Sequence, residues 1–220
     1  MRKLLFVLLV FSSLIFAQTP EIVTTAFAKM EADSVHQYSY MKSVQSTETL
    51  RIMKYDPTRE GSDCWELVSI NGENPNKKEL KAFYKEMSGN SDSKNKSISM
   101  DSDDMINFSI VNDLDNHIEY SFNMEGDEDD KMADALTCTI SLNKIDSTIT
   151  KMTMYITETL SPMVSVKIEE FKIEMNFDKL AQTGSTLIQE TKTRIKGQAM
   201  VFKKIDENVT ETYFDYKLVD

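Results

Sequence analysis

Few side chains in this sequence are of the kinds that carry catalysis or bind metals, and none of them falls in a known motif. The only two histidines, His36 and His117, each lie in a stretch whose pattern is typical of a β-strand. A lone histidine on a strand is more often a surface or hydrogen-bonded residue than a metal ligand. The sequence also lacks a GxSxG nucleophile elbow, a GxGxxG or Walker-type phosphate loop and an HExxH zinc motif. We therefore predict that the protein is not an enzyme and that it has no metal site and no cofactor.

Acidic side chains are the most clustered chemical groups. They gather at residues 101–104, at Asp113 and Asp115, and at residues 125–130. Carboxylates are good Ca²⁺ ligands, but no cluster has the EF-hand spacing, and Gly126 precedes its acids instead of following them. Runs of like charge usually stay in water, so we interpret these clusters as solvated turns. A hydrolase with two catalytic carboxylates stays open as a minor hypothesis, because the fold sets the distance between such groups.

Methionine is the most suggestive feature of the composition. The chain has 14 methionines, and 13 remain when Met1 is left out. Methionine is flexible and polarizable, so it suits irregular cavities that accept apolar ligands. The competing interpretation, which we favour, is that methionine fills core positions in a chain whose codon usage is biased, as its four arginines against 21 lysines indicate.

The N-terminus predicts export. Arg2 and Lys3 precede an apolar run over residues 4–16, and the small residue Ala17 then meets a polar Gln18. This pattern is typical of a signal peptide at residues 1–17, and the run is shorter than the ~20 apolar residues of a spanning helix. No cysteine follows the expected cleavage site, so we expect no lipoprotein anchor. The prediction is a periplasmic protein, not membrane-spanning after cleavage, with one domain at residues 18–220.

Net charge excludes one class of partner. The formal charge is -11, and loss of Arg2 and Lys3 would leave 23 basic against 36 acidic residues, or -13. Nucleic-acid binding depends on clustered lysine and arginine that neutralise phosphates, and no basic stripe is present. We predict no nucleic-acid partner, and an anionic membrane surface is disfavoured for the same reason.

Two cysteines remain, Cys64 and Cys138. An exported protein tolerates disulfides, and a bridge between these two would close a loop of about 75 residues, worth roughly 4 kcal/mol. Two buried free thiols are the alternative, and the sequence leaves both open.

Alternation of apolar and polar residues predicts strands. Residues 136–142 and 152–156 alternate strictly and are separated by a short polar stretch, which predicts a hairpin. Residues 164–177 alternate as well, but the parity changes at Glu169 and Glu170, which predicts either a bulge or a tight turn. Further strands are expected at residues 36–44, 49–55, 65–70, 118–124, 187–195, 198–203 and 209–216, with turn signals at residues 71–72, Gly126, Gly184 and Gly197.

Two helices complete the expected fold. Residues 20–32 form an amphipathic pattern, and a second helix is expected from Asn76, with Glu79 completing a capping box. The polar residues 88–99 are expected to form a mobile loop. Because strands do not alternate with helices, we predict a mainly β (α+β) fold with an antiparallel sheet.

One stretch resembles a known family. Tyr55-Asp56-Pro57, followed by Trp65, Leu67, Gly72, Pro75 and Glu79, is similar to a pattern in a group of exported bacterial proteins with the LolA/LolB-like half-barrel fold. The resemblance implies a curved antiparallel sheet wrapped around helices, with an apolar concavity that in characterised members holds acyl chains of lipoproteins or lipids. After the leader only Arg51, Arg59 and Arg194 remain, so no functional arginine of the lipoprotein carriers is carried over.

These observations lead to one main functional hypothesis and one alternative. The main hypothesis is a periplasmic binding or carrier protein for a lipid, a lipidated protein or another apolar ligand. The residues predicted to line its cavity are Phe122, Met152, Met154, Ile156, Phe171, Ile173, Met175 and Phe177. The alternative is a non-catalytic interaction or structural module of the cell envelope that binds a protein partner through its sheet edge or acidic face.

Overall fold

A computed structural model describes residues 19–33, 38–92, 104–125, 131–163, 165–200 and 203–219. The predicted signal peptide, His36 and most of the two clusters at residues 101–104 and 125–130 lie outside the described residues. Most of the predicted loop at 88–99 lies outside them too. Its first five residues are helical, so the helix runs further than its composition suggested.

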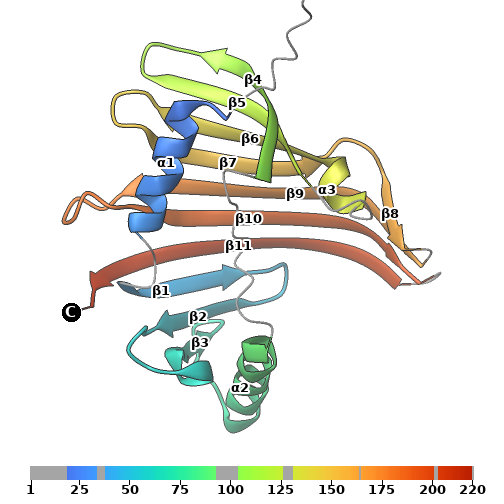
Figure 1. The fold of residues 1–220 in the computed structure, drawn as a ribbon. Coiled ribbons are helices and arrows are strands. Elements are labelled where there is room, and N and C mark those ends of the chain that lie inside the picture. The colour runs from blue at the N-terminus through green and yellow to red at the C-terminus, as the bar shows by residue number, and fades with distance from the viewer. Residues whose placement is uncertain are drawn as a thin grey trace, which may run out of the picture.

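The described chain is dominated by one large antiparallel sheet of 11 strands that does not close on itself (Figure 1). Its order is β3-β2-β1-β11-β10-β9-β7-β6-β5-β4, and β8 pairs with β9 outside this path. The strands are β1 Tyr38–Gln45, β2 Leu50–Tyr55, β3 Trp65–Ile70, β4 Met105–Asp113, β5 His117–Met124, β6 Leu136–Asn143, β7 Thr148–Ile156, β8 Leu160–Met163, β9 Val166–Lys179, β10 Thr186–Ala199 and β11 Lys203–Leu218.

Two long helices accompany the sheet, as predicted. Helix α1 (Glu21–Ala32) lies across one face of the sheet, and α2 (Lys77–Asp92) lies at the far end beside β3 (Figure 1). Shorter helical turns are η2 (Gly61–Cys64) and α3 (Lys131–Ala135). No helix among the described residues has the length and apolar character needed to cross a bilayer. The mainly β fold with two principal helices is therefore confirmed.

The capping box predicted for α2 is present. The Asn76 side-chain oxygen accepts hydrogen bonds from the backbone N–H groups of Lys78 and Glu79, at 2.9 and 3.1 Å. The Glu79 carboxylate in turn accepts the Asn76 N–H at 2.7 Å. These bonds satisfy donors that a helix start otherwise leaves unpaired, so this local sequence defines where α2 begins.

The parity change in β9 is a bulge and not a turn. Strand β9 is continuous, and its pairing with β10 shifts where Lys196 faces Glu170 while Gly197 faces Ile168. Glu169 is therefore the extra residue. A Cβ at Gly197 would lie 2.1 Å from the Lys167 carbonyl oxygen, so only glycine fits across the bulge.

Gly197 accordingly lies inside a strand. The predicted turn there is wrong, because the glycine signal comes from a close approach of two backbones and not from a chain reversal. Strand β10 runs through the position without interruption. Strand β4 was not predicted; its pairing with β5 contains two register shifts, which break the alternation that would have indicated a strand.

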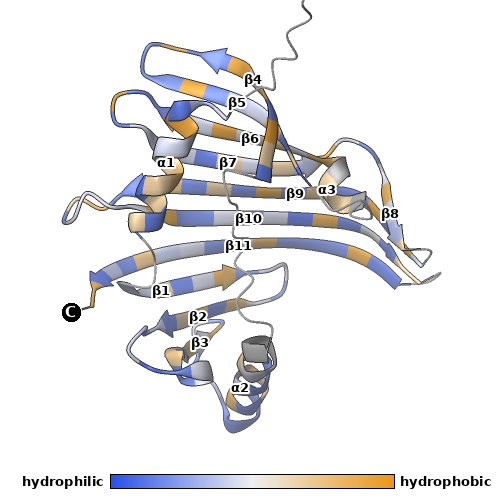
Figure 2. Ribbon diagram, viewed as in Figure 1, coloured by the Kyte–Doolittle hydropathy of each residue, from blue (hydrophilic) through white to orange (hydrophobic). Residues whose placement is uncertain are grey.

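The two faces of the sheet differ sharply in polarity, and the alternation is visible as bands along the strands (Figure 2). Directly paired residues lie on the same face, and one such row contains Phe122, Cys138, Met154 and Ile173. The neighbouring row on the opposite face contains Ser121, Thr139, Thr153, Glu174 and Lys192. We call the first the apolar face. The predicted hairpin of β6 and β7 is confirmed by these pairs.

Candidate ligand-binding face

Three of the predicted lining residues lie in a closed core. Phe122, Met152 and Met154 are 1%, 2% and 4% exposed and belong to a cluster that α1 covers. From α1, the side chains of Val23, Ala26 and Phe27 enter this cluster. Since α1 contacts β6, β7 and β10, this part of the apolar face is packed and not hollow.

The other five predicted residues lie at or beyond the margin of that core. Ile173, Met175 and Phe177 are partly buried and pack against it. Ile156 and Phe171 are also partly buried, but they lie further along their strands, outside the cluster. The structure thus divides the predicted set between a closed part of the apolar face and a more accessible part.

A partly exposed, mainly apolar strip continues from β9 across β10 to Val209 on β11, where the exposed Glu207 faces Ile195. Phe171 pairs with Ile195, and in the next row Ile173, Thr193 and Val209 follow one another across three strands. All five residues are partly exposed. Val209 packs against the cluster under α2, whereas Ile173 packs against the cluster under α1. The strip therefore joins the two helix-covered regions.

An aromatic cluster borders this strip on β1, β2, β3 and β11. Tyr40 is its centre, with ring centroids 5.0 Å from Tyr55, 5.7 Å from Tyr213 and 5.4 Å from Tyr216. Trp65, the only tryptophan of the chain, lies 4.9 Å from the Tyr55 ring and is partly buried. Such rings combine a large apolar surface with a polar tip, which suits a surface that is only partly shielded from water.

An ion pair lies within this aromatic cluster. Lys42 Nζ lies 2.8 Å from a carboxylate oxygen of Glu211, and the Tyr213 hydroxyl donates to the other oxygen at 2.7 Å. The same ammonium lies 5.2 Å from the ring centroid of Tyr213 and 6.0 Å from that of Trp65. Aromatic faces attract a cation at these distances, so the charge is held both by its partner and by the rings.

The sequence contains a signal for this pair in the strand phase of Lys42. Lys42 occupies the inward phase of β1 between the buried Tyr40 and Val44. Glu211 occupies the corresponding phase of β11 between Val209 and Tyr213. On β1, Lys42 is the single charge of an otherwise apolar phase, and such a charge requires a partner. On β11 the phase of Glu211 also contains Glu207, so only Lys42 signals the pair, and its partner comes from the distant end of the chain.

The tyrosines of this cluster are held in the neutral form. Burial raises the pKa of Tyr40, Tyr213 and Tyr216 well above the ordinary value. The nearby Glu211 carboxylate raises the pKa of Tyr213 and Tyr40 further. Their hydroxyls therefore act as hydrogen-bonding groups and not as bases.

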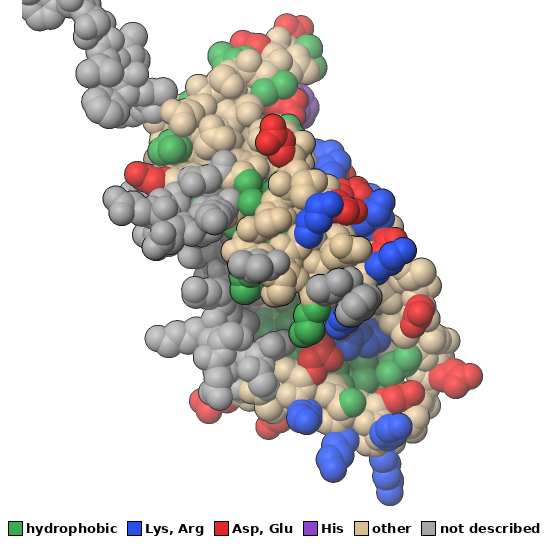
Figure 3. Space-filling model, turned by 90° about the vertical axis from the view of Figure 1, so that its right-hand side faces the viewer, with side chains coloured by type: hydrophobic (Ala, Val, Ile, Leu, Met, Phe, Trp, Pro, Cys, Tyr) green, Lys and Arg blue, Asp and Glu red, His purple; other side chains and the backbone are tan. Residues whose placement is uncertain are grey.

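Helix α2 closes the apolar face at the β3 end. Phe83 is 2% exposed and packs with Val44, Met53 and Leu67. An ion pair at 3.1 Å between Arg51 on β2 and Glu86 on α2 also links the helix to the sheet. Seen from the side, the molecule is hollowed at the height of β1 to β3, with hydrophobic and charged side chains in the hollow (Figure 3).

Among the described residues, the groups that could carry chemistry do not converge on a site. His117 is exposed at the start of β5. Cys64 is partly exposed beside Trp65, Cys138 is fully buried, and both are free thiols. Across the described ranges, no group of three or more histidine, cysteine or acidic residues is placed to hold a metal ion.

Comparison with known proteins gave no relative: no family model, no curated protein and no solved structure matches this chain. The resemblance to the LolA/LolB-like group remains a prediction that depends on residues 55–79.

Proposed function

We propose that this chain is an exported, periplasmic binding or carrier protein for an apolar ligand, such as a lipid or the acyl chain of a lipidated protein. The ligand would lie along the apolar strip between α1 and α2, in a sheet curved as in a half-barrel. This location differs from the centre of the predicted lining set, because Phe122, Met152 and Met154 are buried in the core cluster to which α1 and Phe108 of β4 contribute.

One observation carries this proposal: the apolar face continues beyond the core that α1 closes. Phe171, Ile195 and Val209 keep part of their surface exposed in a row of strands whose other face is rich in ion pairs. Exposed apolar side chains are ordinary when scattered, but a contiguous strip is typical of a binding surface.

The energetics favour a ligand with a hydrocarbon chain. Each CH₂ removed from water contributes about 0.8 kcal/mol, so a chain that covers several side chains of the strip binds without any strong polar contact. The Lys42–Glu211 pair at the border of the strip provides the hydrogen-bonding groups that would contact the polar end of such a ligand.

Trp65 offers a direct test, because the chain has no other tryptophan. We expect fatty acids or phospholipids with brominated acyl chains to quench its fluorescence in a saturable way. Native mass spectrometry of the protein purified from a bacterial envelope should show a bound lipid, which delipidation removes and added lipid restores. Absence of both signals would overturn the carrier function.

Two adjacent residues of β10 provide matched variants. Ile195→Ser alters the apolar strip, whereas Lys196→Ser alters the exposed opposite face one residue away. We expect Ile195→Ser to weaken binding of the brominated lipid about tenfold, since an apolar side chain contributes about 1.5–3 kcal/mol when fully buried. Lys196→Ser should bind like the wild type. Equal effects of the two substitutions would place the ligand elsewhere.

A second candidate function is binding of a protein partner at the edge of the sheet. Strand β4 ends the strand order, and Ile110 and Val111 on it are 59% and 56% exposed. An exposed edge strand with apolar side chains is a template for an added strand, so the partner would contribute an extended segment. In this case an envelope protein should protect the β4 amides from hydrogen exchange, and an Ile110→Lys, Val111→Lys variant should lose that protection.

A further inference from the structure

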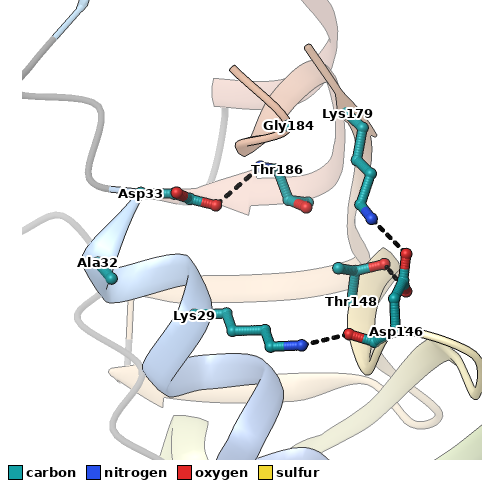
Figure 4. Close-up of a pocket in the computed structure, with 8 residues that line it drawn as sticks. All are labelled: Lys29, Ala32, Asp33, Asp146, Thr148, Lys179, Gly184 and Thr186. Atoms are coloured by element: carbon teal, nitrogen blue, oxygen red, sulfur yellow. Dashed lines mark hydrogen bonds and ion pairs between the residues drawn. The ribbon is translucent and has the colours of Figure 1, made fainter. Parts of the chain in front are cut away.

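A pocket of about 270 Å³ lies at the C-terminal end of α1, apart from the apolar strip. Side chains from α1, from the β6–β7 hairpin and from the segment joining β9 to β10 surround it (Figure 4). The lining residues are Lys29, Ala32, Asp33, Asp146, Thr148, Lys179, Gly184 and Thr186. Most of them carry charged or hydroxyl groups, so the pocket offers hydrogen-bonding partners to a polar ligand.

The Thr186 hydroxyl is the group in this pocket that lacks a partner. Thr186 is 5% exposed, and its Oγ1 has no hydrogen-bond partner in the part of the chain that the structure describes. Its backbone N–H is satisfied, because it donates to the Asp33 carboxylate at 3.0 Å. A buried hydroxyl without a partner destabilises a fold, whereas valine has the same shape without that cost. The described residues therefore leave this hydroxyl able to bond to a further group.

One wall of the pocket carries an excess of positive charge. Lys179 pairs with the Asp146 carboxylate, and Lys29 donates to the backbone carbonyl of Asp146. Hydrogen bonds from Lys179 and Thr148 lower the pKa of Asp146, so its carboxylate is ionised at neutral pH. Two ammonium groups thus face one carboxylate on this side, and each ammonium has further donors to offer.

The other wall is negative. Asp33 follows the last residue of α1, and its backbone N–H caps the helix by donating to the Lys29 carbonyl. The C-terminal end of a helix carries a partial negative charge from the aligned peptide dipoles. The Asp33 carboxylate adds a full charge at the same place, so the pocket is polarised from one wall to the other.

We propose that this pocket binds a small zwitterion of the free amino acid type. The ammonium group of the ligand would lie at Asp33 and the end of α1, and its carboxylate at Lys29 and Lys179. The Thr186 hydroxyl would bond to the ligand between the two charges. Asp33 would repel a simple anion, and the two lysines would repel a simple cation. A neutral polyol would not pair with the charges of either wall.

Calorimetric titration of the full chain tests this proposal with defined probes. Glycine, alanine and serine serve as zwitterions, and acetate, methylammonium and glycerol represent the other three classes. We expect saturable binding of at least one zwitterion and none of the other three probes. Failure of all three zwitterions, or equally tight binding of acetate, would overturn the proposal.

Two substitutions separate a binding role from a structural one. Thr186→Val should weaken zwitterion binding about tenfold, while the melting temperature should not fall, because the unpartnered hydroxyl is removed. Asp33→Asn keeps an oxygen for the Thr186 N–H but removes the charge, so it should weaken binding by about tenfold as well. As a control, Thr212→Val on the exposed face of β11 should leave binding unchanged. Unaltered binding by Thr186→Val would contradict the assignment.

Discussion

The two halves of the apolar face differ in their residue types and in how far they are buried. Under α1 the face is built from aliphatic, methionine and phenylalanine side chains, and many of them are fully buried. Toward β1 and β2 it is built from tyrosines, Trp65 and the Lys42–Glu211 pair, and much of it remains partly exposed. The difference teaches that an inward strand phase identifies the face that avoids water, whereas the covering element decides whether that face is filled.

The largest expected effect comes from a cavity in the closed half. Phe122 is 1% exposed and stacks on Phe108 with ring centroids 5.3 Å apart. We expect Phe122→Ala to lower the free energy of unfolding by about 3–5 kcal/mol, measured by urea titration. Ile195→Ala on the open strip should cost less than about 1.5 kcal/mol, because that side chain is already partly hydrated. Equal losses of unfolding free energy in the two variants would mean that both halves are equally buried.

Thiol reactivity compares the same two halves without disturbing either. Cys138 is fully buried under α1, and burial raises its pKa to about 11. Cys64 is partly exposed beside the aromatic cluster, and its S–H donates to the Arg59 carbonyl. We expect an aromatic disulfide reagent to label Cys64 in the native protein and to label Cys138 at least about a hundredfold more slowly than in urea, because only the thiolate reacts. A Cys64→Ser variant assigns the slow phase, and rapid labelling of Cys138 would show that the core opens easily.

Alkaline pH should affect the aromatic half in particular. The pKa values of Tyr40, Tyr213 and Tyr216 are raised on folding, so their contribution to stability is complete below the unfolded pKa of about 10. Above that pH the unfolded tyrosines ionise first, and stability falls by up to about 1.4 kcal/mol per pH unit for each of them. We expect the unfolding midpoint followed by Trp65 fluorescence to drop steeply there. A Tyr40→Phe variant should show a shallower drop, and an unchanged slope would contradict the assigned burial.

The smallest expected effect concerns the polar groups of the aromatic cluster, which are the Lys42–Glu211 pair and the Tyr213 hydroxyl. Tyr213→Phe removes the hydrogen bond to Glu211 while Lys42 stays in place. Because the pair is partly exposed, we expect a loss of only about 1 kcal/mol in the free energy of unfolding. Lys42→Met and the double variant complete a cycle, in which additive losses would show that the three groups do not form one network.

Much of the fold was predictable because its signals are local. The alternation in residues 136–142 and 152–156 predicts both the hairpin and its inward phase. The changed parity at Glu169 and Glu170 predicts either a bulge or a tight turn, and the pairing with β10 shows that it is a bulge. The box formed by Asn76 and Glu79 likewise needs no information from the rest of the chain.

The remainder depends on contacts between distant segments. Gly197 signals either a turn or a close backbone approach, and only the partner strand distinguishes them. In the same way, strand phase predicts that Met152 points inward, but only the docking of α1 decides that it is covered. Lys42 and Glu211 come from opposite ends of the chain, so their pairing follows from the neighbouring positions of β1 and β11 in the sheet.

The bulge at Glu169 takes up one extra residue, so that Val166 and Ile168 at the N-terminal end of β9 stay on the apolar face. Deleting this one residue would restore regular pairing, would relieve the need for glycine opposite, and would leave Val166 and Ile168 on the same face as now. Regular pairing that kept Glu169 would instead rotate Val166 and Ile168 to the charged side of the sheet. Glu169 and Gly197 are thus coupled positions, and in divergent sequences an extra residue at one should coincide with a missing side chain at the other.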